Sequence, residues 1–213
     1  MILTGNLDDG VAGLWAIKQL GGTTIVQDPA DAMFPSLPHN ALAHVAVDYT
    51  VPLGEIAPLL VRLLAAGVQP AAAREVSSVM EMEVKIGKEE TPLAAGLANV
   101  AQPSTIACPD CHGVLFKIVG NGPIRFRCHT GHAYSIESLL AAVDEGIDGA
   151  LWNATRALEE GMLLLKQMSD HVRGTHGGGD VDRLARRAEE ARAQSRALRQ
   201  MIITRSAVTG DER

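Results

Sequence analysis

Residues 1–26, MILTGNLDDGVAGLWAIKQLGGTTIV, decide the fold of the N-terminal part of the chain. Met1–Thr4 is a short apolar run that stops at a glycine, as a buried strand does, and Thr23–Val26 is a second, β-branched strand. Between them, Val11–Leu20 repeats apolar residues at helical spacing and ends at a glycine pair. A strand, a helix and a strand in this order predict a βαβ unit with parallel strands and a right-handed crossover.

The next predicted elements continue the α/β pattern. We expect a short helix over Pro38–His44, a strand over Val45–Val51 and an amphipathic helix over Gly54–Ala66. Residues 1–66 therefore predict three parallel strands with helices between them. Because so short a segment buries little apolar surface, we interpret it as an incomplete domain.

Two long helices are predicted to form an antiparallel hairpin at residues 135–205. Ser135 is a plausible N-cap, and the second helix, Val181–Thr204, repeats apolar residues in alternating steps of three and four, as a coiled-coil seam does. The first helix is the more apolar, so we expect a third element or a second copy of the chain, in a homodimer formed through the hairpin, to cover it. Trp152 lies on its apolar face and is expected to pack in a core. The apolar positions of this helix are Ile136, Leu139, Leu140, Val143, Ile147, Ala150, Leu151, Ala154, Leu158, Met162, Leu165 and Met168.

The remaining segments complete the predicted organisation. Residues 67–104 are rich in Ala, Pro and Glu and predict a linker, with one short ordered segment at 78–86. Residues 105–134 hold every cysteine, and residues 206–213 form a tail.

The bulk composition excludes several classes of protein. The 213 residues carry a net charge of −6, which does not indicate a nucleic-acid partner. The arginines of the second long helix have acidic neighbours and no interleaved aromatics, so a solvated face is favoured over RNA or an acidic partner. No apolar run is long enough for membrane insertion, and the start lacks the features of a signal peptide. We therefore expect a cytoplasmic protein.

The cysteines form the pattern Cys-x2-Cys-x16-Cys-x3-His, made by Cys108, Cys111, Cys128 and His132. Each pair lies in a predicted tight turn, and a hairpin that joins two such turns gives a tetrahedral zinc site of the zinc-ribbon type. Four protein ligands leave no open position, which predicts structural zinc rather than catalytic zinc. Binding would contribute on the order of 10 kcal/mol to the folding of this small segment.

Alternatives to zinc are a redox Cys-x-x-Cys pair or three unconnected buried cysteines. A redox pair normally opens a helix, whereas here predicted strands follow, at Val114–Val119 and Ile124–Arg127. Gly113 and Gly131 follow the two turns, where a left-handed residue is expected. His112 and His129 directly follow cysteines, so we expect their side chains to point away from the site.

Asp8, Asp9 and Gly10 form a loop after the first predicted strand. The carboxyl end of a parallel strand is where α/β sheets place catalytic groups, and the following helix favours an anionic carboxylate. The plain structural alternative is that the Asp caps the helix and that Asp-Gly forms a turn. The loop by itself leaves both interpretations open.

The residues around this loop resemble the C-terminal third of the CheB methylesterase catalytic domain. The resemblance covers about residues 1–64 and implies part of a doubly wound parallel sheet. In that family a Ser-His-Asp triad hydrolyses the methyl esters of modified glutamates on chemoreceptors, and the triad aspartate matches Asp9 here. Asp8 is then a cap or a solvated neighbour. The matching residues are Ile2-Leu3-Thr4-Gly5, Asp9-Gly10, Ala12-Gly13-Leu14, Ala16-Ile17, Gly21-Gly22, Val26-Gln27-Asp28-Pro29 and Leu37-Pro38.

The chain departs from the family at two points. Relatives carry Gly-Met-Gly before the aspartate, where this chain has Gly5-Asn6-Leu7, and Leu reaches positive φ less readily than Gly. The family's Ser and His lie upstream of the aspartate loop, and no serine or histidine here matches them; His39 stands where relatives carry Arg. The resemblance therefore implies a segment of a protein-glutamate methylesterase that is inactive alone, with chemoreceptors or other signalling proteins as partners.

The cysteine segment resembles an extension that follows the esterase domain in some CheB-like proteins. The similarity begins at Cys108-Pro109 and continues through about residue 168. The resemblance implies no function for this extension. A separate alternative for the whole chain is a non-catalytic zinc-bearing interaction or dimerisation module in bacterial signalling.

Overall fold

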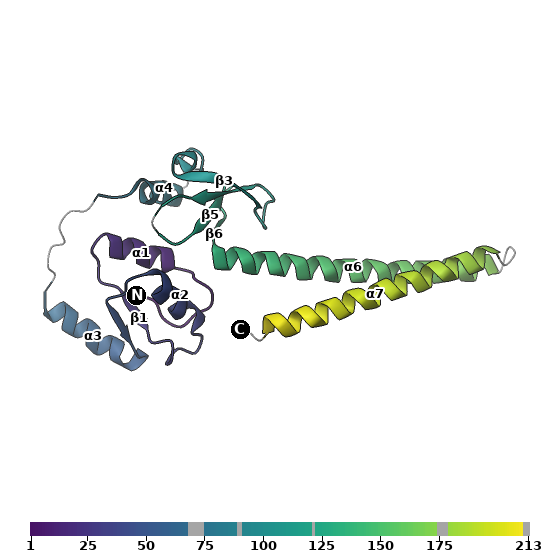
Figure 1. Cartoon of the computed structure of the whole chain (residues 1–213), viewed down its shortest axis with the longest axis horizontal. Coiled ribbons are helices and arrows are strands. Elements are labelled where there is room, and N and C mark those ends of the chain that lie inside the picture. Colours follow the sequence, from purple (N-terminus) through teal and green to yellow (C-terminus); the bar gives the residue numbers. More distant parts are fainter. Residues whose placement is uncertain (68–74, 89–90, 121, 174–178, 211–213) are drawn as a thin grey trace. The chain divides into compact units, whose positions relative to one another are not determined.

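The computed structural model describes residues 1–67, 75–88, 91–120, 122–173 and 179–210. The chain divides into two compact units, Met1–Ala141 and Ala142–Arg213. The first unit holds a small parallel sheet, an antiparallel sheet and the shorter helices, and the second consists of two long helices (Figure 1). No helix in the described residues has both the length and the apolar character needed to cross a bilayer.

The parallel sheet is centred on β1 (Ile25–Gln27), whose residues are all buried. On one side, β2 (Tyr49–Val51) pairs with β1 in parallel. On the other side, the Ile2 N–H donates to the Ile25 carbonyl at 2.9 Å, and the Gln27 N–H donates to the Ile2 carbonyl at 2.9 Å. The predicted parallel pairing of the first two segments is confirmed, although the first segment pairs through a single bridge.

Three helices accompany this sheet where apolar spacing predicts them: α1 (Val11–Gln19), α2 (Ser36–His44) and α3 (Leu53–Ala65). α1 and α2 supply much of one apolar core, with Trp15 packed at its margin. The three strand segments and their helices form a mixed α/β arrangement. The buried members of this core are Ile2, Val11, Leu14, Val26, Ala41 and Val45.

The antiparallel sheet has four strands in the order in which they occur along the chain. They are β3 (Ala101–Ala107), β4 (Val114–Ile118), β5 (Arg125–Cys128) and β6 (Ala133–Ser135). β4 and β5 form the hairpin that the sequence predicts, and β3 and β6 extend it on either side.

The segment 67–104, which the sequence assigns to a linker, contains α4 (Ser78–Gly87), α5 (Leu97–Val100) and the start of β3. α4 begins where the Ser77 hydroxyl accepts from the Met80 N–H at 3.3 Å. Its buried Met82 packs with Val79 and Ile86, which stand at helical spacing, against Leu97 and Ile118. The short ordered segment expected at 78–86 is therefore a helix. The domain boundaries predicted from the sequence stay predictions.

Glu83 of α4 joins this helix to β5. Its carboxylate pairs with the Arg127 guanidinium and lies 3.5 Å from Arg125 Nη1, so two arginines share one acidic partner. Arg127 Nη1 also donates to the Gly131 carbonyl at 2.8 Å. Burial lowers the pKa of Arg125, and in the described residues the Nε atoms of both arginines are buried without a partner.

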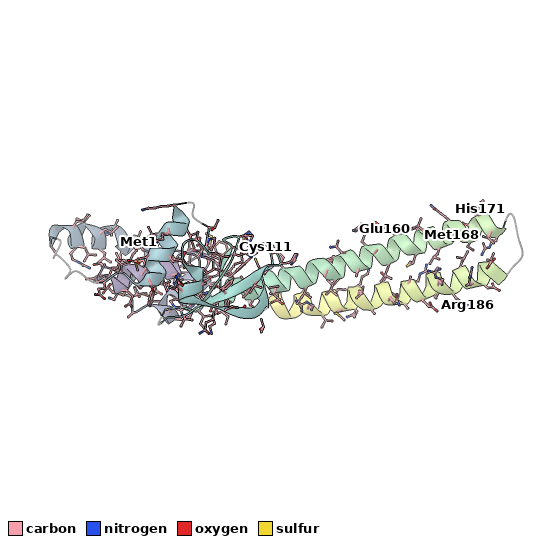
Figure 2. All side chains as sticks on the ribbon, turned by 90° about the horizontal axis from the view of Figure 1, so that it is seen from above. Met1, Cys111, Glu160, Met168, His171 and Arg186 are labelled. Atoms are coloured by element: carbon pink, nitrogen blue, oxygen red, sulfur yellow. The ribbon has the colours of Figure 1, made fainter. Side chains whose placement is uncertain are left out.

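The second unit is an antiparallel pair of helices made by α6 (Ile136–Arg173) and α7 (Gly179–Gly210), which run side by side in Figures 1 and 2. Near the start of α6, Arg205 binds Asp144 at 3.0 Å and Asp148 at 3.1 Å. The predicted seam of α7 is confirmed by burial, because its members are buried or half-buried. They are Val181, Leu184, Ala188, Ala191, Ser195, Leu198 and Ile202.

The apolar stripe of α6 differs from the prediction. Leu151, Leu158, Met162 and Leu165 are half-buried on the face that α7 covers, but many other apolar positions are exposed. Trp152, which was expected to pack in a core, is 52% exposed. Helical spacing alone identifies apolar residues on α6, but it does not say which of them the partner helix reaches.

We predict that Glu83→Gln destabilises the first unit by about 2 kcal/mol, because the substitution leaves two largely buried guanidiniums without a counter-charge. The matched control is Glu81→Gln on the exposed side of the same helix, for which we expect a change below about 0.5 kcal/mol. Chemical denaturation followed by circular dichroism measures both. Equal effects of the two substitutions would contradict the role of Glu83.

Candidate functional site

The loop that carries Asp8 and Asp9 is tied to the segment before α2. The Gly5 N–H donates to the Phe34 carbonyl at 2.9 Å, and the Leu37 N–H donates to the Gly5 carbonyl at 2.9 Å. A Cβ on Gly5 would lie 2.7 Å from Leu37 Cδ2, so a larger residue there would have to displace the Leu37 side chain. The start of the loop is therefore fixed against the body of the α/β part.

Leu7 adopts the left-handed backbone conformation, with φ of 57°. The resemblance places a glycine at this position in relatives, and the sequence analysis expected the leucine to alter the backbone. The chain instead keeps a positive φ, and the Asn40 side-chain amide donates to the Leu7 carbonyl at 2.6 Å. The Leu7 side chain is 42% exposed, so the conformation is held by the loop rather than by burial of the side chain.

The two aspartates lie in different environments. The N-cap position of α1 is occupied by Gly10, and no side chain caps the helix there. Neither aspartate therefore caps α1, and the cap interpretation is wrong for both. Asp8 is also not a solvated neighbour. It is half-buried, and burial raises its pKa although a hydrogen bond from Ser135 opposes this effect. Asp9 is exposed at the carboxyl end of the first parallel segment.

The histidines of the α/β part are not placed as partners of Asp9 by any contact. His39 is exposed, and His44 Nε2 lies 3.5 Å from Glu137 Oε1. Glu137 belongs to the first turn of α6. The His44 imidazole therefore lies beside Glu137 rather than beside Asp9.

The cysteines and His132 lie in two turns at the ends of the antiparallel sheet. In the first turn the Cys108 N–H donates to the Gly113 carbonyl at 2.7 Å, and in the second the Cys128 N–H donates to the His132 carbonyl at 3.0 Å. β4 and β5 bring the turns together, since Leu115 lies opposite Cys128.

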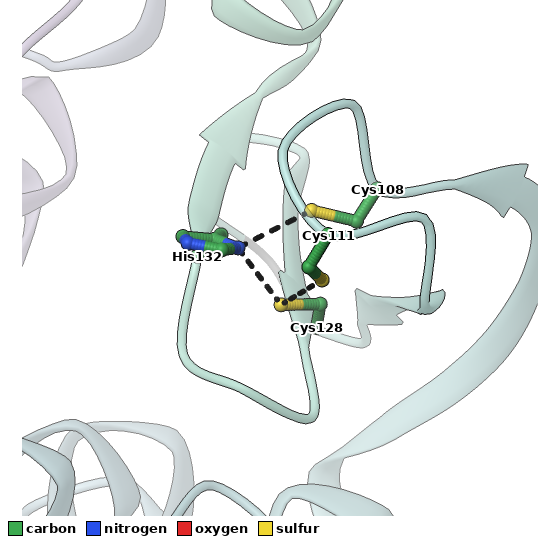
Figure 3. A group of neighbouring side chains, drawn as sticks. All are labelled: Cys108, Cys111, Cys128 and His132. Carbon is green, nitrogen blue, oxygen red and sulfur yellow. Dashed lines mark hydrogen bonds between the residues drawn. The ribbon is translucent and has the colours of Figure 1, made fainter.

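The four side chains converge on one point, as Figure 3 shows. Their ligand atoms all lie within 4.8 Å of one another. The Cys111 and Cys128 sulfurs are 3.7 Å apart, and His132 Nδ1 lies 3.4 Å from Cys108 Sγ and 3.5 Å from Cys128 Sγ. Bond lengths of about 2.3 Å to sulfur and 2.0 Å to nitrogen, arranged as a tetrahedron, place sulfurs about 3.8 Å apart and nitrogen about 3.5 Å from sulfur. These four residues thus form a cluster whose dimensions fit a tetrahedral metal ion.

The electrostatics of the cluster favour a cation. Burial raises the pKa of Cys108, whereas a hydrogen bond from Thr130 lowers that of Cys111. Burial also acts to raise the pKa of Cys128, but hydrogen bonds from Thr130 outweigh it and lower this pKa to about 6. Hydrogen bonding with Cys111 raises the pKa of His132. The sulfurs of Cys111 and Cys128 therefore lose their protons more readily than ordinary thiols and attract positive charge, which a proton on His132 or a metal ion can supply.

Thr130 and Tyr134 are further members of the site that the sequence analysis missed. The Thr130 hydroxyl lies 2.8 Å from Cys128 Sγ and 3.3 Å from Cys111 Sγ. The Tyr134 hydroxyl donates to Asp110 and lies 3.8 Å from Cys108 Sγ. The position of Thr130 inside a turn flanked by two predicted ligands is the signal that could have identified it.

The residues that follow the cysteines behave differently in the two turns. Gly131 has φ of 112°, as expected, but in the first turn the left-handed residue is His112, with φ of 58°, rather than Gly113. A Cβ on Gly113 would lie 2.4 Å from His129 Cε1, so the His129 ring packs closely over the first turn. The imidazole that joins the cysteine cluster is that of His132.

Comparisons with known proteins concern the N-terminal segment. Residues 1–60 match the family model described as CheB methylesterase. A putative protein-glutamate methylesterase/protein-glutamine glutaminase of Leptospira interrogans is 44% identical over 63 residues, which cover 30% of this chain and 33% of that protein. Two further relatives are named protein-glutamate methylesterase/protein-glutamine glutaminase, and each is 44% identical to this chain over 64 residues. The match to the Moorella thermoacetica protein covers 30% of this chain and 15% of that protein. The match to the Bordetella pertussis protein covers 30% of this chain and 18% of that protein.

The chain thus spans at most a third of the length of these relatives. No solved structure matches the chain.

We predict that Leu7→Gly stabilises the first unit by about 1 kcal/mol, because glycine removes the cost of a left-handed leucine while little buried apolar surface is lost. Leu42→Gly is the matched control, since Leu42 is 36% exposed but lies within α2, where glycine costs about 1 kcal/mol. Denaturant midpoints of the two variants should move in opposite directions. A loss of stability in both would show that Leu7 is not strained.

Proposed function

We propose that residues 1–64 are the C-terminal segment of a chemotaxis-type protein-glutamate methylesterase, a carboxylic ester hydrolase that acts on receptor glutamate methyl esters. The supporting observation is the position of Asp9, exposed after a parallel strand in a segment 44% identical to proteins with that name. On this proposal the segment belongs to a doubly wound sheet, and Asp9 is the triad aspartate. The same carboxylate would serve hydrolysis of the glutamine side-chain amide, the second activity in the relatives' names.

The chemical role proposed for Asp9 is to hold an imidazole. In a Ser-His-Asp triad the aspartate fixes the imidazole tautomer and stabilises the cation formed when His accepts the serine proton. The rigid anchoring of the loop through Gly5 and Asn40 supports this role, because the carboxylate must keep a fixed direction. His39 and His44 do not provide that imidazole, so we propose that the chain alone does not hydrolyse esters.

We further propose that Cys108, Cys111, Cys128 and His132 hold a structural Zn²⁺. Their spacing and the low pKa of Cys128 support a metal site, and the Thr130 hydroxyl would donate to a ligand sulfur. A zinc ion supplies charge neutralisation and a fixed link between the two turns. Residues 105–134 would then be a zinc ribbon, between the α/β part at 1–66 and a helical hairpin at 135–205.

The second candidate function is a non-catalytic, zinc-bearing interaction module in bacterial signalling. It is favoured by the exposed apolar residues of α6, among them Leu140, Leu163 and Leu164. Under both proposals the partners are chemoreceptors or other signalling proteins, the location is the cytoplasm, and the hairpin offers a surface for a homodimer.

A chimera tests the role of Asp9. The matched 64-residue segment of the Moorella thermoacetica relative is replaced by residues 1–64 of this chain, and hydrolysis of methylated receptor is measured. We expect an active chimera whose Asp9→Asn variant loses kcat by about 10³–10⁴-fold, the scale of a triad aspartate, whereas Asp8→Asn stays within about tenfold. A fully active Asp9→Asn chimera would rule out the proposed role.

The isolated chain should show no ester hydrolysis above background in the same assay. Turnover that Asp9→Ala abolishes would contradict its proposed inactivity.

Elemental analysis tests the zinc site. We expect one zinc per chain, and none in Cys128→Ser or His132→Gln, because each variant removes one of four ligands. His129→Gln is the matched control and should keep its zinc, since His129 packs over Gly113 and leaves coordination to His132. A folded, metal-free protein with three titratable thiols, or loss of zinc in His129→Gln but not in His132→Gln, would overturn the assignment.

A further inference from the structure

A second apolar seam runs along α6, next to the face that α7 covers. The first seam contacts α7 and includes Leu151, Thr155, Leu158 and Met162. Each residue of the second seam comes one position before a residue of the first seam, as Ala150 comes before Leu151. Consecutive residues of a helix are rotated by about 100°, so the two seams lie about 100° apart around α6. The second seam consists of Val143, Ile147, Ala150, Ala154, Ala157, Gly161, Leu164 and Met168, in steps of four and three throughout.

This second seam is open in the described structure. Val143 and Ile147 are each 39% exposed, Leu164 is 59% exposed and Met168 is 52% exposed. The three alanines are exposed as well, and a Cβ built on Gly161 would meet nothing within 4 Å. An unbroken heptad repeat of apolar and small residues is typical of a helix that packs against another helix, so α6 has room for a second neighbour.

From this surface we infer that two copies of the chain associate through the second seams of their α6 helices, in an antiparallel arrangement. The inference deepens the proposal that the hairpin forms a homodimer, and it does not depend on the esterase or zinc proposals. The occupant must be a helix about as long as the seam, which extends about 39 Å at 1.5 Å per residue.

Within the described residues, only α6 and α7 have that length. The next longest helix, α3, has 13 residues. α7 already packs on the first seam, and its other faces carry arginines such as Arg186 and Arg187. A second α6 is therefore the occupant that this chain can provide.

The order of side-chain sizes is compatible with the antiparallel direction. A two-fold axis between Thr155 and Arg156 places Val143 opposite Met168 of the second copy and Ile147 opposite Leu164. The same axis places Ala150 opposite Gly161 and Ala154 opposite Ala157. Large residues then meet large ones at both ends, and the small residues at the centre let the two backbones approach closely.

Charge also permits this pairing. On the flank of the second seam away from α7 lie Gly146, Asn153, Glu160 and Gln167. The axis brings Asn153 near Glu160 of the second copy and Gly146 near Gln167, so no like charges meet. A strip about 39 Å long and about 10 Å wide on each copy has an area of about 390 Å². The two copies together therefore bury on the order of 800 Å² before side-chain relief, which is below the roughly 1,200 Å² of standard specific interfaces and indicates weak association. We therefore expect a reversible dimer with a micromolar dissociation constant.

Sedimentation equilibrium of the full chain from about 5 to 200 µM tests the inference. The 22.5 kDa chain should approach twice its monomer mass as concentration rises. Ala157→Glu on the second seam should remain monomeric throughout, whereas Ala193→Glu on the exposed outer face of α7 should dimerise like the unsubstituted chain. Circular dichroism and zinc content, unchanged in both variants, would show that the fold and the proposed metal site persist. A monomeric unsubstituted chain at 200 µM, or equal dimerisation of both variants, would overturn the inference.

A charge swap tests the direction of the pairing. Ile147→Glu and Leu164→Lys should each abolish association, because each places a charge in the apolar seam. The association constant of the double variant should exceed that of either single variant at least tenfold. The reason is that the introduced carboxylate of one copy faces the introduced ammonium of the other only when the helices are antiparallel. Monomeric single variants without recovery in the double variant would overturn the antiparallel arrangement.

Discussion

Three sulfur atoms and one imidazole nitrogen within 4.8 Å of one another are the constraint on which the antiparallel sheet depends. Cys108 and Cys128 are also buried members of the apolar cluster of this sheet, together with Leu115, Phe126 and Leu139. The ligand cluster and the core are therefore one structure. Whatever positive charge neutralises the sulfurs also allows the small core to close, because unpaired charges at such a site would oppose burial. The outer strands β3 and β6 can then pair with the two edges of the β4–β5 hairpin.

Local pattern explains how much could be predicted from the sequence. The helices at Val11–Gln19 and Leu53–Ala65 follow apolar periodicity, and the parallel bridge at Ile2 follows from the order of strand, helix and strand. The convergence of the cysteines with His132 follows from turn spacing, because tight turns fix where side chains point. These features depend on residues that lie close together in the sequence, which is why they can be read from it.

The features that were missed depend on distant contacts. An ordered segment was expected at 78–86, but its helical form was not, because α4 is stabilised by packing of Met82 against Leu97 and Ile118. The left-handed backbone of Leu7 requires Asn40, which lies far along the chain, and residue preference argues against it. The division of the α6 stripe into two seams likewise depends on the position of α7. In each case a tertiary interaction overrides or refines a local preference.

The contacts of Arg127 have a consequence for how the first unit opens. This one side chain binds Glu83 on α4 and the carbonyl of Gly131 in the turn between Cys128 and His132. If that turn comes apart, Arg127 loses one of its two anchors and its hold on α4 weakens. The cysteine turns and α4 then behave as a single cooperative opening unit. Protease cleavage at α4 and exposure of the cysteine thiols become two readouts of the same fluctuation.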